Sequence, residues 1–195
     1  MRVIAGSARG RRLVAPKGRD VRPTSDRVKE AVFSSLQADL PGARVLDLFA
    51  GSGALGIEAL SRGAAHATFV ERAGPALTAI GRNLDTADVA DRATVVSGEL
   101  PAAVARVDGP VDIVLVDPPY ALDPTVVAAV LAAVAPLTTP GAVWRVEADV
   151  RTPAPSWPAL VEPGRVRRYG DTAIHEGRTR PAPDLATPPD PEEPT

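Results

Sequence analysis

The sequence predicts an α/β domain built on a mostly parallel, doubly wound sheet, and three features of the chain predict it. From about residue 43 onward, short apolar runs alternate with stretches of helical periodicity, as parallel strands joined by crossover helices do. A glycine-rich turn follows the first of these runs, and a later run, VDIVLV, breaks abruptly into Asp117-Pro118-Pro119-Tyr120. The length of 195 residues suits one domain of this kind with a small extension.

The first 40 residues form that extension. Residues 2–5 and 11–15 are short apolar runs on either side of a glycine-containing turn, so we expect a β-hairpin. Thr24-Ser25-Asp26 offers a helix N-cap, and apolar residues at helical spacing follow it as far as Leu36. Residues 1–40 are therefore predicted to be a hairpin and one helix.

Residues 41–180 are predicted to form the sheet domain. The expected strands are residues 44–49, 67–71, 93–98, 111–117 and 142–148, and the expected helices are residues 54–62, 75–86, 101–106 and 125–135. Residues 166–176 have the pattern of an antiparallel hairpin that closes the sheet. Residues 181–195 are rich in proline and acids, which cannot build a core, so we expect a disordered tail there.

Composition excludes several classes of protein. The chain has no cysteine, so disulfides and thiolate chemistry are absent, and its two histidines, His66 and His175, supply no metal-ligand spacing. No apolar run approaches the roughly 18 residues of a membrane span, and the amino terminus lacks the apolar region of a secretory signal. We therefore expect a cytoplasmic protein without a metal or a membrane anchor.

Charge is distributed unevenly along the chain. Residues 1–30 carry nine Lys or Arg against three acids, whereas the whole chain has a net charge of -2. A basic arm on an acidic body favours a polyanionic partner that approaches from one side. A solvated arginine-rich surface without a partner is the alternative.

The first strand leads into a glycine-rich turn. Gly51, Gly53 and Gly56 fit the spacing G-x-G-x-x-G between a strand and a helix, where glycines allow a tight turn and a close approach to a ligand. Glu71 ends the second strand about twenty residues later, where an acid accepts the hydroxyls of a ribose. A surface glutamate without a ligand is the alternative for Glu71.

Asp47 argues against a dinucleotide as this ligand. The carboxylate lies inside the strand, four residues before Gly51, and a buried ionised group needs a cationic partner. The ammonium of an amino-acid moiety, as in S-adenosylmethionine, can supply one. Glu99, after the third strand, can contact the adenine edge, although it can equally be an acid at a helix N-terminus.

The stretch VDIVLVDPPY places an acid and an aromatic ring on stiff backbone. Its first six residues are almost all apolar and β-branched or leucine, which predicts a strand buried on both faces, and its two prolines cannot continue the ladder. In open α/β sheets, ligands bind at the carboxyl ends of the strands. Asp117 and Tyr120 are therefore candidate site residues.

These residues resemble a known family. DLFAGSGALGIEAL followed by DPPY resembles the class I S-adenosylmethionine-dependent methyltransferases, which have a Rossmann-like fold and act on exocyclic amino nitrogens. The arm MRVIAGSARGRRLVAP with RPTSDRVKEAVFSSL resembles specifically the RsmD-type enzymes, which methylate the N2 of a guanine in bacterial small-subunit (16S) rRNA. The chain departs from that pattern at Glu99, where the family commonly has Asp, and in its proline-rich tail.

The resemblance implies a set of site residues. The catalytic residues would be Asp117, Pro118, Pro119 and Tyr120. The residues that hold S-adenosylmethionine would be Asp47, Phe49, Ala50, Gly51, Ser52, Gly53, Glu71, Arg72, Glu99 and Leu100. The residues that contact RNA would be Arg9, Arg11, Arg12, Arg22, Thr24 and Arg27. The expected partner is small-subunit rRNA within a ribosomal particle, and the protein is expected to be a monomer.

These residue types suit the chemistry. The lone pair of an exocyclic amine is delocalised into the base, and hydrogen bonds from its two hydrogens to Asp117 and the Pro118 carbonyl favour the geometry in which the lone pair can attack. Tyr120 would stack on the extruded base. Three alternatives remain: an adenine-N6 methyltransferase acting on RNA or DNA, an NAD-dependent oxidoreductase, and a non-catalytic RNA-binding factor for ribosome assembly.

Overall fold

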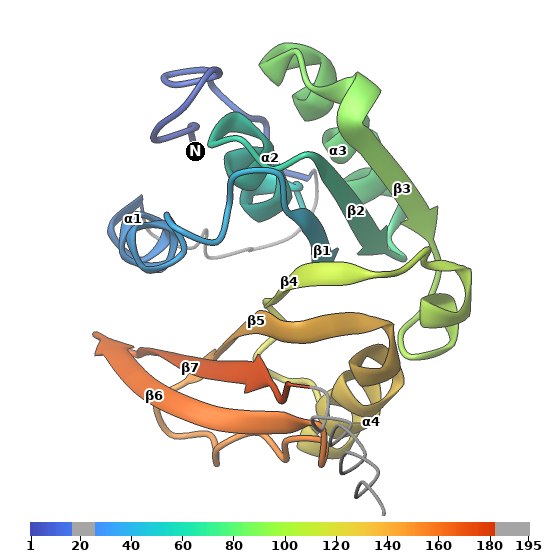
Figure 1. The fold of residues 1–195 in the computed structure, drawn as a ribbon. Coiled ribbons are helices and arrows are strands. Elements are labelled where there is room, and N and C mark those ends of the chain that lie inside the picture. The colour runs from blue at the N-terminus through green and yellow to red at the C-terminus, as the bar shows by residue number, and fades with distance from the viewer. Residues whose placement is uncertain (17–25, 182–195) are drawn as a thin grey trace, which may run out of the picture.

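A computed structural model describes residues 1–16 and 26–181, with the side chains of residues 26 and 27 excepted. These residues form one seven-stranded sheet of order β3-β2-β1-β4-β5-β7-β6 (Figure 1). The strands are β1 (Arg44–Leu48), β2 (His66–Glu71), β3 (Ala93–Ser97), β4 (Val111–Val116), β5 (Thr138–Asp149), β6 (Val161–Tyr169) and β7 (Thr172–Thr179). The first five pair in parallel, and β7 pairs antiparallel with both β5 and β6. The predicted fold class is confirmed.

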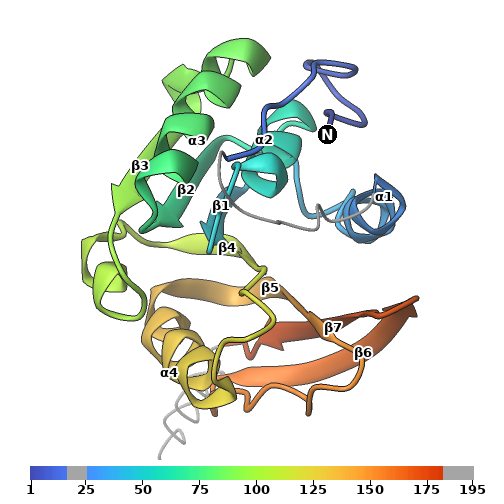
Figure 2. The same ribbon diagram turned by 180° about the vertical axis from the view of Figure 1, so that it is seen from behind.

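Helices cover both faces of this sheet. They are α1 (Asp26–Ser35), α2 (Ala54–Ser61), α3 (Gly74–Ala87) and α4 (Pro124–Val134), with short 3-10 turns η1 (Ala90–Arg92), η2 (Ala102–Arg106) and η3 (Ala135–Leu137). One core cluster joins the sheet to α1, α2 and α3, and a second joins it to η2 and α4 (Figure 2). Neighbouring residues of β1 alternate between the two, since Val45 belongs to the first cluster and Leu46 to the second. The sheet is therefore buried on both faces, as a parallel sheet requires.

The register of β1 and β4 positions the site. The two strands pair in parallel from Val45 with Ile113 to Leu48 with Val116, so both end at the same edge of the sheet. The strand order changes direction between them, because β2 lies on one side of β1 and β5 on the far side of β4. Ligands bind at such a switch point in open α/β sheets.

The amino-terminal arm, residues 1–16, differs from the predicted hairpin. Its two halves run antiparallel, with hydrogen bonds from Val3 N to Arg11 O (3.0 Å) and from Leu13 N to Met1 O (3.1 Å), but they form only one isolated bridge, Arg2 with Arg12. The physical reason is that the backbone N–H groups of Ile4 and Ala5 donate to the Glu58 carboxylate on α2. The arm is therefore anchored to the domain instead of pairing fully with itself.

Helix α1 and the sheet elements agree with the prediction to within a few residues at their ends, except that β5 and β6 each begin four or more residues earlier. The proposed cap residues 24 and 25, and all but the first residue of the predicted tail, lie outside the described part of the chain. Across the described ranges, every helix is too short or too polar to cross a membrane.

Candidate functional site

The glycine-rich loop after β1 is held in a tight turn by backbone conformations that glycine adopts easily. Gly51 and Gly53 have φ angles of 56° and 76°, and Gly53 precedes the first turn of α2. Phe49 also has a positive φ, 57°, which costs a non-glycine residue free energy and is typical of functional loops. At Gly56, a Cβ atom would lie 2.3 Å from the Phe69 ring, so a side chain there would push α2 away from β2.

Asp47 lies beneath this loop and is the most unusual carboxyl group of the site. It is 1% exposed, and its Oδ2 accepts a hydrogen bond from Gly56 N at 2.8 Å. Burial raises its pKa well above the ordinary value, and the negative charges of Asp117 and Glu71 raise it further, against the hydrogen bond from Gly56. Three acids therefore converge on one loop, and a bound cation would relieve their repulsion.

Glu71 braces the loop through its backbone. Its Oε2 accepts from Gly51 N (2.9 Å), and its Oε1 accepts from Arg72 N and Ala73 N (both 2.8 Å). A carboxylate offers about four lone-pair sites, so these bonds leave room for about one more. Both ribose hydroxyls are expected to bind Glu71, but only about one acceptor position, on Oε2, is free for them.

Glu99 and Arg72 form an exposed ion pair at the ends of β3 and β2. The Arg72 Nη1 to Glu99 Oε1 distance is 2.6 Å, with side-chain exposures of 59% and 72%. Leu100, the next residue, is buried in the core cluster that also contains α4. The two charged side chains thus stand at the edge where the adenine is expected, while Leu100 contributes packing.

The segment Asp117–Tyr120 continues directly from β4. Asp117 N donates to Leu48 O at 3.4 Å, which joins the ends of β4 and β1. Asp117 and Pro118 are half-buried, whereas Pro119 and Tyr120 are exposed. Burial raises the pKa of Tyr120, and its hydroxyl lies 3.5 Å from Glu147 Oε1 on β5. Asp117 therefore lies beside the end of β1, and the 52%-exposed ring of Tyr120 lies beside the end of β5.

A buried amide that the sequence analysis missed fastens this loop to the arm. Asn83 on α3 is 1% exposed, and its Nδ2 donates to Ser52 O (2.8 Å) and to Val14 O (3.0 Å). Its Oδ1 accepts from Val14 N at 2.8 Å. An asparagine within the helical stretch IGRNLDTA gave no signal in the sequence.

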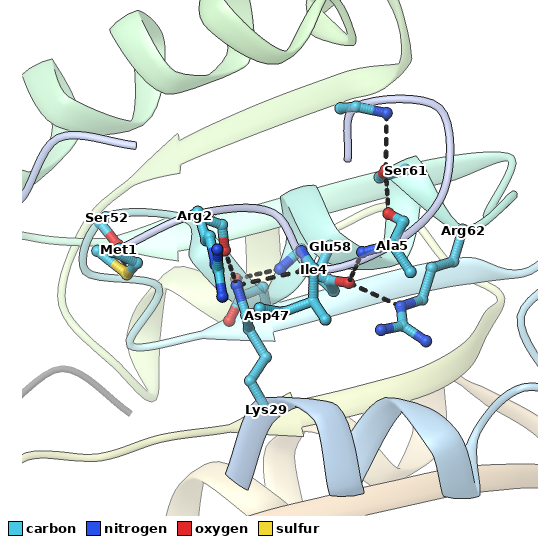
Figure 3. A network of polar contacts seen from close by, with 12 residues as sticks. Met1, Arg2, Ile4, Ala5, Lys29, Asp47, Ser52, Glu58, Ser61 and Arg62 are labelled. Carbon is cyan, nitrogen blue, oxygen red and sulfur yellow. Dashed lines mark hydrogen bonds and ion pairs between the residues drawn. The ribbon is translucent and has the colours of Figure 1, made fainter. Parts of the chain in front are cut away.

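A buried carboxylate was missed as well. Glu58 is fully buried, and its oxygens bind Ile4 N (2.8 Å), Ala5 N (3.0 Å), Lys29 Nζ of α1 (3.2 Å) and Arg62 Nε (2.7 Å), as Figure 3 shows. Lys29 Nζ also donates to the Arg2 carbonyl. An acid inside the otherwise apolar helix ALGIEALS was the available signal. Glu58 therefore joins the arm, α1 and α2 in one network.

The structure brings most of the predicted cofactor residues together around the end of β1. Ala50 and Ser52 are nearly buried, and Ser52 Oγ lies 3.6 Å from Met1 Sδ of the arm. Arg9, Arg11 and Arg12 are exposed on the arm, and Arg11 also donates to Thr86 O at 3.1 Å. Arg22 and Thr24 lie outside the described residues, as does the side chain of Arg27.

The residues of the site fit S-adenosylmethionine as a ligand. The loop presents backbone at close range, and the three converging acids favour a ligand with positive charge, which a sulfonium and an ammonium group carry. No cluster of three or more potential metal ligands occurs among residues 1–16 and 26–181. An apolar hollow of about 660 Å³ borders the site beside Glu99 and Leu100.

Comparisons with known proteins agree with this arrangement. A family model described as "Conserved hypothetical protein 95" matches residues 1–178. "Putative rRNA methyltransferase YlbH" of Bacillus subtilis is 48% identical over 124 residues, which span 62% of this chain and 67% of that protein. "Ribosomal RNA small subunit methyltransferase D" of Escherichia coli K12 is 44% identical over 120 residues. These residues span 62% of this chain and 60% of the relative, so the chain aligns with about three fifths of its length.

A solved structure is similar over nearly the whole chain. "Putative methyltransferase yhhF from Escherichia coli" superposes with a TM-score of 0.80 at 34% identity. The match covers 93% of this chain and 99% of that structure.

Proposed function

The chain belongs to the family described as Conserved hypothetical protein 95, and on this premise we propose that it transfers a methyl group from S-adenosylmethionine to the exocyclic N2 of a guanine in small-subunit rRNA. The observation that carries the proposal is the convergence of Asp47, Glu71 and Asp117 on the glycine-rich loop, beside the rigid segment that ends in Tyr120. One loop suits a cationic cofactor, and the neighbouring segment suits a planar base. The names of the relatives at 44% and 48% identity support rRNA as the substrate.

The cofactor would be held by the loop from Asp47 to Gly53 and by the acids at the ends of β2 and β3. Asp47 would balance its positive charge, Glu71 Oε2 would accept from a ribose hydroxyl, and Glu99 would stand near the adenine. The cofactor supplies an electrophilic methyl group that is already activated by the sulfonium charge. The chain therefore has to position the base and accept the proton that its amino group loses.

Asp117 and the Pro118 carbonyl would accept hydrogen bonds from the two amino hydrogens of the guanine. These bonds orient the nitrogen lone pair toward the methyl group and stabilise the positive charge that develops on the nitrogen. Asp117 is half-buried at the end of β4, and in this arrangement it would receive the proton. Tyr120 would stack on the extruded base, which contributes roughly 1–3 kcal/mol per base.

The exposed arginines of the arm would bind phosphates of the substrate. Such contacts depend on salt and carry no sequence information, so they position the RNA while the base pocket selects the nucleotide. We propose that the protein acts in the cytoplasm as a monomer on a ribosomal particle. Methyl transfer to naked rRNA alone would contradict the last point.

The deciding experiment uses labelled S-adenosylmethionine and small ribosomal subunits from a strain that lacks the corresponding enzyme. We expect label on the N2 of a single guanine, mapped by nuclease digestion and mass spectrometry. Label on the N6 of adenine, or no label, would overturn the proposal. Asp117→Ala should abolish transfer while calorimetry still detects cofactor binding, and an active Asp117→Ala enzyme would remove the role given to this acid.

A further inference from the structure

We propose that the outer strand β6 carries a second RNA-binding surface, formed by Arg165, Arg167 and Arg168 and called here the β6 arginine surface. The inference rests on the proposed function, because it adds a contact to the same substrate. It differs from the arm arginines in position, since β6 lies at the other end of the sheet (Figures 1 and 2).

The β6 arginine surface is exposed along almost its whole length. Every residue of β6 from Glu162 to Arg168 is exposed, and within the described residues the strand pairs only with β7. Arg167 is held by Glu176 at 2.8 Å and is still 43% exposed. Arg165 and Arg168 have no acidic partner among the residues that the structure describes. Two guanidinium groups without an acidic partner and one oriented by a carboxylate therefore lie along the exposed edge strand, with Arg167 and Arg168 on opposite faces of the sheet.

This surface ends beside the candidate site. Strand β6 finishes at Tyr169, and β7 begins three residues later at Thr172, so the turn between them lies at the same edge as the end of β5. Tyr120 shares a side-chain hydrogen bond with Thr172, and Val150 N donates to Asp171 O at 2.9 Å. The residue proposed to stack on the base thus lies beside Thr172, the first residue of β7 after the turn that follows Arg168.

The arrangement places the site between two basic surfaces. The arm packs on α2 at one side of β1 and β4, and β6 lies beyond β5 and β7 at the other (Figure 1). Each is a local excess of positive charge on a chain whose net charge is -2. An RNA strand that delivers a base to Tyr120 and touches the arm can continue across the sheet edge to Arg168 and Arg165. The substrate that fits is RNA bound on both sides of the target nucleotide.

Charged side chains on an edge strand have another use, which is to prevent pairing with a second molecule. That role predicts a different result. Neutral replacements would then cause self-association without changing the affinity of the monomer for RNA. The two roles can be separated by measuring RNA affinity and mass on the same sample.

The test compares the wild type with the double variant Arg165→Gln/Arg168→Gln. The matched control is Arg180→Gln, an exposed arginine directly after β7. It lies near the first residue of β6, which is about 23 Å along the strand from Arg168 and therefore far from the candidate site. Filter binding to a small-subunit rRNA fragment is measured over a series of salt concentrations. Light scattering records the mass, and calorimetry with S-adenosylmethionine confirms that the cofactor site is intact.

If each arginine contacts one phosphate, the slope of log K against log salt should fall by about 0.7 per contact for single-stranded RNA and about 0.9 for a duplex. At 0.15 M salt, two lost contacts correspond to roughly 10- to 30-fold weaker binding. Arg180→Gln should match the wild type. An unchanged slope in the double variant would overturn the inference, and so would self-association with unchanged affinity.

Failure of this inference is distinguishable from failure of the proposed function. If the wild type methylates the particle and the double variant binds RNA as tightly as the wild type, only the proposed role of the β6 arginine surface is refuted. A wild-type protein that transfers no methyl group removes the proposed activity. The binding measurement on the rRNA fragment still decides in that case whether β6 contacts RNA.

Discussion

The amide of Asn83 should be the most sensitive point of the molecule outside the reacting groups. It makes three hydrogen bonds, two with the backbone of Val14 in the arm and one with the carbonyl of Ser52 in the glycine-rich loop. Replacing it by alanine leaves one donor and two acceptors without their partner. We expect the variant to lose stability and also to bind S-adenosylmethionine more weakly.

The size of the loss follows from where each bond lies. Val14 is 48% exposed, so water can reach its backbone, and each of its two bonds contributes about 1 kcal/mol. The bond to Ser52 O is buried, and an acceptor left dry costs about 1–3 kcal/mol. The free energy of unfolding should therefore fall by about 3–5 kcal/mol, which a domain with a stability of roughly 5–15 kcal/mol can survive. Release of the Ser52 carbonyl should weaken cofactor binding by about tenfold, or about 1.4 kcal/mol.

Urea denaturation gives the stability, and calorimetry gives the cofactor affinity. The informative comparison is Asn83→Asp, which keeps the shape of the side chain and an acceptor for Val14 N but replaces the Nδ2 donor by a carboxylate oxygen that faces two carbonyls. It should be no better than Asn83→Ala. Asp85→Asn, an exposed change on the same helix, should leave both quantities unchanged within about 0.5 kcal/mol. If Asn83→Asp behaved like the wild type, packing alone would account for the position and the reasoning would be refuted.

Three further predictions concern the loop and the base site. In a urea titration, Gly56→Ala should lower the free energy of unfolding by about 1–3 kcal/mol, because the added Cβ would meet the buried Phe69 ring. Gly81→Ala, in α3 with open space around it, should raise the free energy of unfolding by about 0.5–1 kcal/mol. Burial raises the pKa of Asp47, so a cationic cofactor should displace a proton from it; calorimetry in buffers of different ionisation enthalpy should detect the release, and Asp47→Asn should abolish it. The folded protein keeps this proton to higher pH than the unfolded chain does. The free energy of unfolding of the cofactor-free wild type should therefore fall as pH rises from the ordinary carboxyl range through the raised pKa of Asp47. Asp47→Asn should lose this dependence of stability on pH. In single-turnover assays, Tyr120→Phe should keep most of the rate of methyl transfer, and Tyr120→Ala should lower this rate by about 10- to 100-fold. The free energy of unfolding should change by no more than about 0.5 kcal/mol, because the side chain is 52% exposed.

The central part of the fold was predictable because its signals are local. Strand β4 has four β-branched residues among its six, and two consecutive prolines follow it closely, so its position follows from local backbone restrictions. The glycine-rich loop follows from the φ angles that Gly51 and Gly53 must adopt. Asp47 stood out because a carboxylate in a buried strand is costly, and the structure gives the same reason in its raised pKa.

The arm was harder because its partners are far away in the sequence. Residues 2–5 have the composition of a strand, but the N–H groups of Ile4 and Ala5 bind Glu58, more than fifty residues later. No periodicity in either segment reports that pairing. The occupancy of the Glu71 carboxylate was hidden for a similar reason, because its acceptor sites can be counted only when the curvature of the loop is known.

These long-range contacts change how the arm relates to the cofactor loop. Glu58 lies on α2, the helix that begins directly after Gly53, and it holds both the arm and, through Lys29, α1. Asn83 holds the arm and the loop by one amide. Movement of the arm when phosphates bind to its arginines therefore acts on Asn83, which also holds the glycine-rich loop, and on Glu58, which lies in the helix that follows this loop. Binding of RNA and of the cofactor should consequently be coupled, and by linkage each ligand must raise or lower the affinity of the other by the same factor.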